Sequence, residues 1–252
     1  MHTLDTWAQV NRWHDRPLEN GALAGGLLAL AMLLPPFPDA LLILAVSIAA
    51  VTVGAGVPLR AWVRAMTVPS VFLVLGMFPM LLTVRRSIGA GLAIGIHQEG
   101  LATALHTGLR AMAATASLIF LGLTTPVPAQ IGVLRRLGLP VVLLDLMALT
   151  YRLLFLLEEI ALRMIAAQVG RLGYRTLRVG FRSGALATAG LFSRTLARAQ
   201  AMERGLAARG YDGDLAVLHI FRKPNPRRLA AIALTQGLIL LFELARRRAF
   251  RV

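Results

Sequence analysis

Five long runs of apolar residues, almost free of charge, limit what this chain can fold into. They are Gly21–Leu34, Ala40–Val57, Val68–Val84, Ala111–Thr125 and Ala230–Phe242. A helix needs roughly 20 apolar residues to cross the hydrocarbon core of a bilayer, and several runs reach that length only with their flanks. Tilted or re-entrant segments would also fit. The runs predict an all-α integral membrane protein with about five to six hydrophobic helices.

The composition and the N-terminal segment agree with a membrane protein. Hydrophobic residues make up 57% of the chain and charged residues 15%, whereas soluble domains average about 45–50% and about 25%. The absence of Cys excludes disulfides and thiolate metal sites. The first 20 residues are polar, so we expect no cleavable signal peptide but an amphipathic lead-in. Trp7 and Trp13 are its candidate anchors at the membrane interface.

The positive charge is concentrated in one part of the chain. Between Arg163 and Arg228 there are 13 Lys or Arg residues and only three acids. Because basic residues favour the cytoplasmic side of a membrane protein, this block is predicted to be cytoplasmic. Two loops expected at Pro58–Thr67 and Thr125–Pro140 each carry two arginines and are expected on the same side.

The chain divides by composition into three sections. Residues 1–125 hold the lead-in and the first membrane helices, residues 126–228 are amphipathic and basic, and residues 229–252 form a last apolar helix with a basic tail. If the N-terminus is cytoplasmic, four membrane crossings bring the chain back to the cytoplasmic side at residue 125. A fifth crossing by the last apolar helix would then place Arg246–Arg248 on the opposite side of the membrane. A re-entrant last helix, or another crossing within Val141–Leu157, would satisfy the positive-inside tendency.

A first long amphipathic helix is expected within Val141–Arg175, which contains no Pro and no Gly before Gly170. Gly170 and Gly173 are expected to end it. Glu159 and Arg163 are spaced to pair on successive turns. The apolar positions of its second half follow helical spacing, at Ile160, Met164 and Ala167.

A second amphipathic helix is expected from about Gly184 to Ala208, with Gly210 as its stop signal. Arg209 lies at its last turn, where the helix dipole favours a cation, and the small Ala208 leaves the guanidinium room to project. Such a planar donor can bind a carboxylate of another protein, although an Arg-Gly pair also ends many solvated helices. The apolar face of this helix is weaker and comprises Leu191, Thr195, Met202 and Leu206.

The sequence lacks the residues for catalysis, cofactor binding or metal binding. A P-loop needs a Lys beside Ser or Thr after a Gly-rich loop, and the only Lys is Lys223, between Arg222 and Pro224. If ATP drives this protein, another chain hydrolyses it. The five His residues form neither an HxH nor an HExxH cluster, and no catalytic, cofactor or metal residue is expected.

Ionisable residues within or beside the apolar runs leave two interpretations open. Asp145, Arg152 and Glu243 could pair internally and hold the helices in shape, while Arg110 lies near a segment end and could snorkel to the interface. A supporting role is also expected of Arg110, Glu159 and Arg163. Alternatively, Arg110, Asp145 and Arg152 could line the pathway of a stand-alone carrier or channel. A membrane enzyme would need convergent acid, base or metal-binding residues, which the sequence does not offer.

Several stretches, in this order and spacing, resemble the CbiQ-type transmembrane (T) component of energy-coupling factor (ECF) transporters. They are Leu4–Gly21, Gly108–Ala113, Thr124–Pro126, Leu134–Pro140, Leu149–Glu159 and Ala201–Tyr211. The last stretch matches the family's Ala-Arg-Gly signature at Ala208, Arg209 and Gly210. The family's other signature, at the end of the earlier helix, is altered here to Arg171-Leu172-Gly173. Arg171 is the expected anchor there, with Arg175 as the alternative.

The resemblance implies a non-catalytic subunit with two cytoplasmic coupling helices. Their arginine-bearing ends would dock in grooves on two ATPase subunits and transmit motion to a membrane substrate-binding subunit, CbiM-like, with a small CbiN-like subunit. The implied substrate is a divalent transition metal, cobalt first, with nickel or vitamin systems as alternatives. The implied location is the bacterial inner membrane. Membrane lipid is a further expected partner, and nucleic acid is not, because few aromatic residues lie among the arginines.

Overall fold

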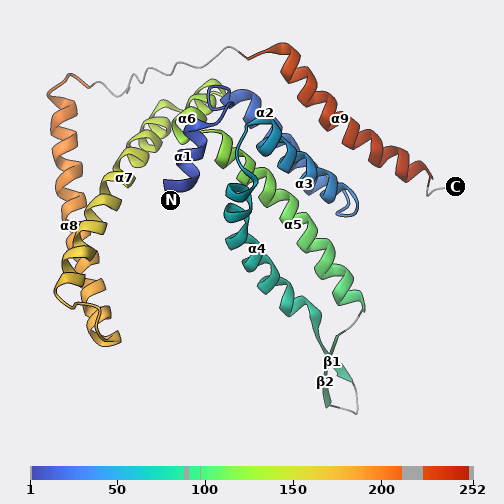
Figure 1. Ribbon diagram of the computed structural model, residues 1–252, viewed down its shortest axis with the longest axis horizontal. Coiled ribbons are helices and arrows are strands. Elements are labelled where there is room, and N and C mark those ends of the chain that lie inside the picture. The colour runs from blue at the N-terminus through green and yellow to red at the C-terminus, as the bar shows by residue number, and fades with distance from the viewer. Residues whose placement is uncertain (1, 88–90, 97, 212–223, 250–252) are drawn as a thin grey trace. The chain divides into compact units, whose positions relative to one another are not determined.

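The structure is a computed structural model that describes residues 2–87, 91–96, 98–211 and 224–249 (Figure 1). Contacts divide the chain into two units. The first unit comprises Met1–Gln130 together with Ile220–Val252, and the second comprises Ile131–His219. The last apolar helix therefore packs with the N-terminal membrane helices, although the basic section separates them in the sequence.

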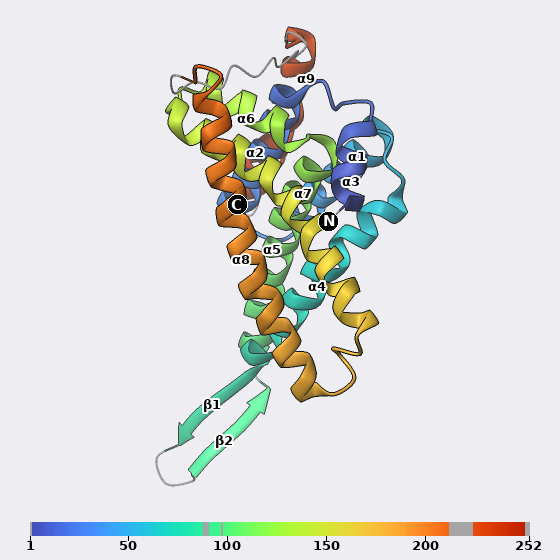
Figure 2. The same cartoon turned by 90° about the vertical axis from the view of Figure 1, so that its left-hand side faces the viewer.

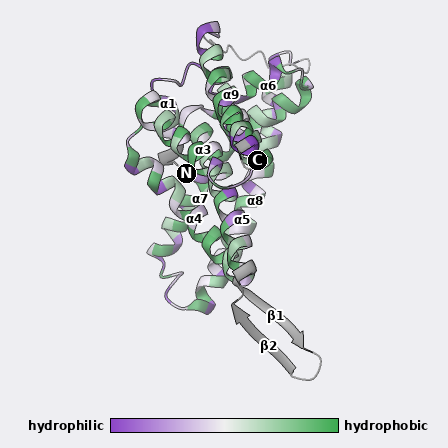
Figure 3. Ribbon diagram, turned by 90° about the vertical axis from the view of Figure 1, so that its right-hand side faces the viewer, coloured by the Kyte–Doolittle hydropathy of each residue, from purple (hydrophilic) through white to green (hydrophobic). Residues whose placement is uncertain are grey.

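The first unit is built from apolar helices. They are α1 (His2–Val10), α2 (Pro17–Leu33), α3 (Asp39–Ala49) with the π-helical turn η1 (Ala50–Gly54), α4 (Leu59–Leu81), α5 (Gln98–Thr124) and α9 (Pro226–Ala249). Among the described residues, α4, α5 and α9 are long and apolar enough to cross a membrane, and α2 and α3–η1 are shorter apolar helices. All five apolar runs thus lie in helices for most of their length, which confirms the predicted all-α membrane class. Figure 3 shows the predominantly hydrophobic residues of these helices.

The structure corrects the expected boundaries in three places. The loop expected at Pro58–Thr67 is instead the start of α4, because Pro58 can precede a helix and no helix breaker follows until Pro69. The loop expected at Thr125–Pro140 contains α6 (Val127–Arg136). Helix α4 ends at Leu81, so the last residues of the apolar run Val68–Val84 lie outside it.

A β-hairpin follows α4, where the apolar pattern predicted no strand. Strand β1 (Leu82–Ser87) pairs antiparallel with β2 (Gly91–Ile96), with Leu82 opposite Ile96 and Ser87 opposite Gly91 (Figure 2). β-Branched residues are frequent in strands. Each strand here has only six residues, however, and hydrophobic periodicity over so short a segment does not distinguish a strand from the end of a helix.

Helices α2 and α5 of the first unit run in opposite directions. Asn20, near the start of α2, contacts Thr125 after the end of α5, whereas Leu34 after α2 contacts Arg110 in the first half of α5. The two helices are therefore antiparallel. The fully buried side chains form one core between α2, α3, η1 and α5, and include Leu27, Ile43, Val51, Phe120 and Leu123.

Asn11 connects the lead-in to the end of α5. Its side-chain amide, Nδ2, lies 3.3 Å from the carbonyl oxygen of Leu123 and 3.1 Å from that of Thr124. The same atom lies 3.0 Å from the carbonyl of Trp7 and 2.7 Å from that of Ala8, at the end of α1. The last carbonyls of a helix have no partner within it. One buried amide therefore caps two helices at once.

Asn20 continues this polar contact from the start of α2. Its Nδ2 lies 3.0 Å from the carbonyl oxygen of Trp13 and 3.0 Å from the hydroxyl of Thr125. Gln130 donates to the carbonyl of Thr125 at 2.9 Å. Asn20 and Thr125 are almost completely buried, so these bonds form where water cannot replace them.

Trp13 packs into the first unit as well as being a candidate interface residue. A Cβ at Gly54 would lie only 2.3 Å from its indole, so this close approach requires glycine. The indole also meets the ring of Phe120 edge-on, with ring centroids 6.4 Å apart. This packing of the lead-in against η1 and α5 was not evident from the sequence.

Polar contacts fasten α9 to α2 and α3 at both of its ends. Glu19 of α2 accepts a hydrogen bond from the backbone of Asn225 at 2.9 Å and lies 3.8 Å from the guanidinium of Arg228. Further along, Gln236 donates to the carbonyl of Ala22 at 3.1 Å, so α9 runs parallel to α2. α9 is one uninterrupted helix and does not fold back as a re-entrant segment would.

The basic end of α9 is locally neutralised. Arg246 and Arg247 both bind the buried carboxylate of Glu243, at 2.5 Å and 2.6 Å. Arg246 also lies 3.8 Å from the buried Asp39 at the start of α3. Two of the arginines that conflicted with the positive-inside tendency are therefore paired with two acids. This pairing does not remove the conflict, because acids contribute little to that tendency.

Truncation of Asn11 should destabilise the protein. In Asn11→Ala, buried carbonyls at the ends of α1 and α5 lose their donor, and each unsatisfied buried group costs about 1–3 kcal/mol. For a chain of this size, one such group corresponds to a Tm lower by roughly 2–12 °C. Thermal unfolding in detergent measures the change. Gln9→Ala is the control, because the exposed Gln9 donates only to Asp5 of the same helix; equal Tm values for Asn11→Ala and wild type would contradict the assignment.

Candidate functional site

The second unit contains a hairpin of two long helices, α7 (Val141–Gly170) and α8 (Leu177–Ala207). α8 begins seven residues earlier than the expected Gly184, because Thr176 caps it by accepting a hydrogen bond from the backbone of Val179 at 3.3 Å. The two helices are antiparallel. Gln168 near the end of α7 donates to the carbonyl of Ser183, whereas Asp145 near its start accepts from the hydroxyl of Tyr211 beyond α8.

The apolar face predicted for α8 is the face that packs. The four predicted residues are half-buried in a chain region that is otherwise largely exposed, namely Leu191, Thr195, Met202 and Leu206. On α7, Ile160 and Met164 are half-buried as predicted, but Ala167 is exposed and Gln168 takes the next position. The predicted pair of Glu159 and Arg163 is present on the exposed side of α7.

The turn between α7 and α8 is held by side-chain hydrogen bonds. The hydroxyl of Ser183 donates to the carbonyl of Gly173 at 2.7 Å, and the hydroxyl of Tyr174 donates to the amide oxygen of Gln168 at 2.7 Å. A Cβ at Gly173 would lie 2.8 Å from Ser183 Oγ and 2.9 Å from the carbonyl of Gln168. Gly173 is thus required for close packing, not as the residue that stops the helix.

Leu172 is the residue that stops α7, with a left-handed φ of 57°. The backbone N–H of Gly173 donates to the carbonyl of Gln168 at 2.8 Å, and that of Leu172 to the carbonyl of Val169 at 3.0 Å. This pair of bonds is a Schellman motif. The residue directly before the left-handed position is Arg171.

The end of α8 has the same geometry. The backbone N–H of Tyr211 donates to the carbonyl of Leu206, and that of Gly210 to the carbonyl of Ala207, both at 3.1 Å. Gly210 is left-handed with a φ of 74°, and Arg209 directly precedes it. By backbone position Arg171 therefore corresponds to Arg209, and Leu172 to Gly210, so the altered signature keeps the spacing between arginine and left-handed residue.

The end of α6 shows which part of this geometry is specific. Gly138 is left-handed there with a φ of 84°, and Leu139 donates to the carbonyl of Leu134 as in the other two motifs. The residue before Gly138 is Leu137, which is not charged. The backbone motif alone is therefore an ordinary helix end. The ends of α7 and α8 differ from that of α6 because an arginine directly precedes the left-handed residue.

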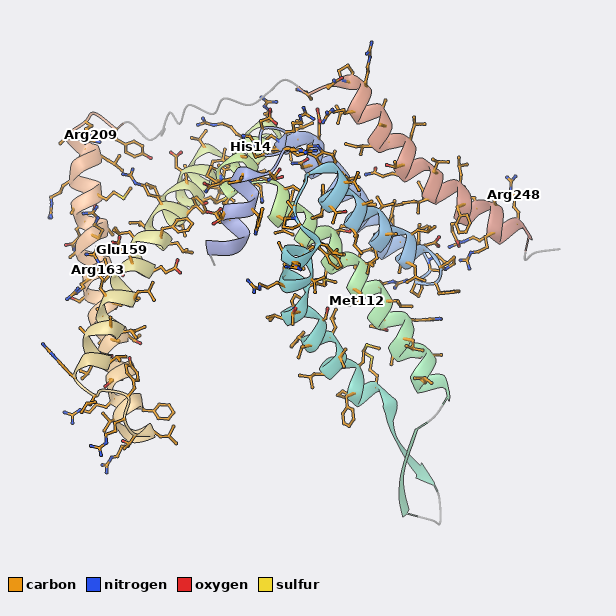
Figure 4. All side chains as sticks on the ribbon, viewed as in Figure 1. His14, Met112, Glu159, Arg163, Arg209 and Arg248 are labelled. Atoms are coloured by element: carbon orange, nitrogen blue, oxygen red, sulfur yellow. The ribbon has the colours of Figure 1, made fainter. Side chains whose placement is uncertain are left out.

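The guanidinium groups of Arg171 and Arg209 are exposed. Within the part of the chain that the structure describes, neither makes a hydrogen bond or an ion pair, in contrast to Arg163, which binds Glu159. Figure 4 shows Arg209 at the end of α8 and the Glu159–Arg163 pair along α7. Each free guanidinium offers five donors in a fixed plane, at a helix end whose dipole favours a cation.

Of the other expected supporting residues, Arg110 and Asp145 are engaged within their own units. Arg110 donates to the carbonyl of Leu34 at 3.2 Å and so caps the end of α2. Asp145 binds Tyr211 and thereby ties the start of α7 to the end of α8. Arg152 is exposed on α7. Among the described residues, no three His, Asp or Glu side chains gather in a way that could hold a metal ion.

Replacing Leu172 by glycine should stabilise the second unit. A left-handed conformation costs a non-glycine residue about 1–2 kcal/mol, and the side chain of Leu172 is 66% exposed, so it regains little by burial. After allowing for the entropy of glycine, we expect Leu172→Gly to raise the free energy of unfolding by about 1 kcal/mol. Thermal unfolding in detergent tests this, with Gly210→Ala expected to lower the stability. A lower Tm for Leu172→Gly would contradict the strain.

Comparison with known proteins covers most of the chain. A family model described as CbiQ, cobalt transport protein, matches residues 9–218. The chain is 40% identical over 239 residues to the cobalt transport protein CbiQ of Rhodobacter capsulatus, which covers 94% of this chain and 96% of the relative. It is 31% identical over 223 residues to the CbiQ protein of Salmonella typhimurium, covering 85% of this chain and 99% of the relative.

A third relative is a longer protein. The putative fused cobalt transport protein CbiMQ of Methanocorpusculum labreanum is 33% identical over 135 residues, which are 54% of this chain and 22% of that protein. The family model includes the lead-in from residue 9, the membrane helices α2 to α5 and both arginine-bearing helix ends. The chain therefore belongs to the CbiQ family of cobalt transport proteins.

Proposed function

We propose that this chain is the membrane coupling subunit of an ATP-driven, ECF-type importer of a divalent transition metal, with cobalt as the first substrate. The observation that carries the proposal is the matched pair of helix ends. Arg171 and Arg209 occupy the same position before a left-handed residue, and both guanidinium groups are exposed. Two equivalent cationic ends suit two equivalent partners.

The proposed partners are two cytoplasmic ATPase subunits. The chain cannot supply a P-loop, because its only lysine is Lys223, so ATP hydrolysis belongs to other chains. Each arginine would enter a groove and bind a carboxylate through its planar fork of donors. The second unit, with its excess of positive charge, would lie on the cytoplasmic side of the bacterial inner membrane.

The connections of the second unit offer a route for transmitting motion. Thr125, where the chain leaves α5, is bonded to Asn20, and Asn225, where the chain enters α9, is bonded to Glu19. Asn20 and Glu19 are neighbours on α2, so both connections leave the first unit at the same end. A displacement of the α7–α8 hairpin would therefore act on α5 and α9 together.

The proposed membrane partner is a CbiM-like substrate-binding subunit, accompanied by a small CbiN-like subunit. The name of the fused CbiMQ relative supports such an association, because it joins both components in one chain. In this proposal residues 1–125 and 229–252 provide the membrane scaffold and residues 126–228 the coupling section. Nickel or vitamin uptake by a related system is the alternative substrate assignment.

A stand-alone carrier or channel is the other function considered. Its pathway would use Arg110, Asp145 and Arg152. The structure favours the coupling role, because Arg110 is bonded to the carbonyl that ends α2 and Asp145 to Tyr211 at the end of α8. Both side chains thus have partners that stabilise helix ends within their units.

Charge reversal at the end of α8 tests the coupling role. Arg209→Glu should detach the ATPase subunits, since removal of one partner of a buried charge pair costs about 3–5 kcal/mol, or roughly 100-fold or more in affinity. Co-purification of the ATPases with the tagged chain and ATP-driven metal uptake in proteoliposomes are the measurements. Arg204→Glu, one turn earlier and also exposed, is the matched control and should retain both. Normal co-purification and uptake with Arg209→Glu would refute the proposal.

The first helix end provides a separate prediction. Arg171→Glu should weaken ATPase association far more than Arg175→Glu, because Arg171 and not Arg175 has the backbone position of Arg209. Pull-down of the ATPases from membranes that contain each variant at equal amounts compares the two. A larger loss with Arg175→Glu would assign the anchor to the alternative residue.

A further inference from the structure

A cavity lies between the lead-in helix α1 and the first turns of α4, and the coupling role makes no use of it. Its volume is about 570 Å³. One wall is the indole of Trp7, and the other walls belong mainly to one face of α4, formed by Arg60, Ala61, Arg64, Ala65 and Val68. Both helices belong to the first unit.

The lining has a basic part, Arg60 and Arg64, which we call the mouth, and an apolar part, Ala61, Ala65 and Val68, which we call the floor. Arg60 and Arg64 are four residues apart and therefore project from the same face of α4 on successive turns. Ala61 and Ala65 follow them on the adjacent row, and their small side chains leave the space open. Val68 lies roughly 12 Å along the helix axis from Arg60, at 1.5 Å per residue, and continues the floor.

Both arginines at the mouth are free to bind a ligand. They are exposed, and across the described ranges neither forms a hydrogen bond or an ion pair with another residue. The two guanidinium groups place two positive charges on one face of α4. Among the described residues of the first unit, no acid is bonded to either of them. A phosphate group, with several acceptor oxygens, matches the paired donor forks of arginine.

The position of the cavity identifies the source of such a phosphate. α4 is one of the helices able to cross a membrane, over Leu59–Met80, and the arginines lie in its first two turns. Beyond Val68, which lies near the middle of this span, the exposed side chains of Phe72 and Leu75 continue the same apolar surface into its second half. Trp7 has the amphipathic ring typical of the membrane interface. A cationic mouth followed by an apolar track matches a headgroup followed by an acyl chain.

We propose that this cavity is a binding site for an anionic phospholipid. Arg60 and Arg64 bind the headgroup phosphate, Trp7 lies beside the glycerol region, and an acyl chain follows Ala65 and Val68 down α4. α1 is fastened to the end of α5 through Asn11, so a lipid held between α1 and α4 connects three helices. These helices meet at the end of the first unit from which the coupling section emerges. The site does not depend on the proposed coupling role.

The test measures lipid retained by the purified full-length chain. Native mass spectrometry after exchange into detergent with equal amounts of phosphatidylglycerol and phosphatidylcholine should show roughly tenfold preference for phosphatidylglycerol. Both lipids offer the same phosphate to the arginines, but phosphatidylcholine also carries a choline cation, which two neighbouring guanidinium groups repel. Arg60→Gln with Arg64→Gln should abolish the preference. The matched control replaces Arg194 and Arg198 by Gln, an exposed pair at the same spacing on α8, and should keep it.

Two further arms separate the lipid from other ligands. Ala65→Leu fills the floor and leaves both arginines in place, so it should reduce retention of phosphatidylglycerol about as much as the double arginine variant. Inorganic phosphate at millimolar concentration should not displace the lipid. Equal retention by wild type and the double variant, an equal loss in the α8 control, or an unchanged Ala65→Leu variant would each overturn the proposal. Displacement by phosphate would assign the site to a soluble anion, and preferential capture of an acidic peptide to a protein partner, either of which also overturns it.

Discussion

The structure depends on how the open end of α5 is capped. Thr124 and Leu123 present carbonyls that the helix cannot bond itself, and these lie where the lead-in, α2 and α5 meet. The amides of Asn11 and Asn20 satisfy this end from two different segments. The first unit continues from there to Gln130, which donates to the carbonyl of Thr125. The same contact therefore joins the lead-in, α2 and α5, which explains why the polar lead-in is part of the fold.

Charge is used differently in the two units. In the first unit, three buried acids lie beside arginines of α9: Glu19 at its start, and Glu243 and Asp39 at its end. Glu243 binds Arg246 and Arg247, whereas Asp39 lies 3.8 Å from Arg246. Such pairs stabilise contacts between helices in a bilayer, where apolar side chains gain little by leaving lipid for another helix. In the second unit, Arg171 and Arg209 have exposed guanidinium groups without partners in the described chain. Arg228, Arg246 and Arg247 thus serve packing within the first unit, whereas Arg171 and Arg209 stay available for binding.

The comparison of the two helix ends shows why a motif read as letters can mislead. Arg171-Leu172-Gly173 looks like an Arg-Gly pair interrupted by an inserted residue. The backbone instead places Leu172 where Gly210 stands in the other motif, and Gly173 is needed for its contact with Ser183. A left-handed leucine is unfavourable by itself, so local propensity pointed to the glycine. The hydrogen bonds across the hairpin hold the turn in a register that propensity does not predict.

The sequence by itself determined the membrane class, the apolar helices, the packed face of α8 and the pairing of Glu159 with Arg163, because periodicity and hydropathy act over short distances along one helix. The capping by Asn11, the packing of Trp13 against Gly54 and the ion pair of Arg246 with Asp39 were decided by the tertiary structure. They depend on partners remote in the chain, such as Leu123 for Asn11 or Asp39 for Arg246, and no local pattern encodes them. Contacts between distant segments satisfy polar groups that each segment leaves open, and only the folded chain shows which segments meet.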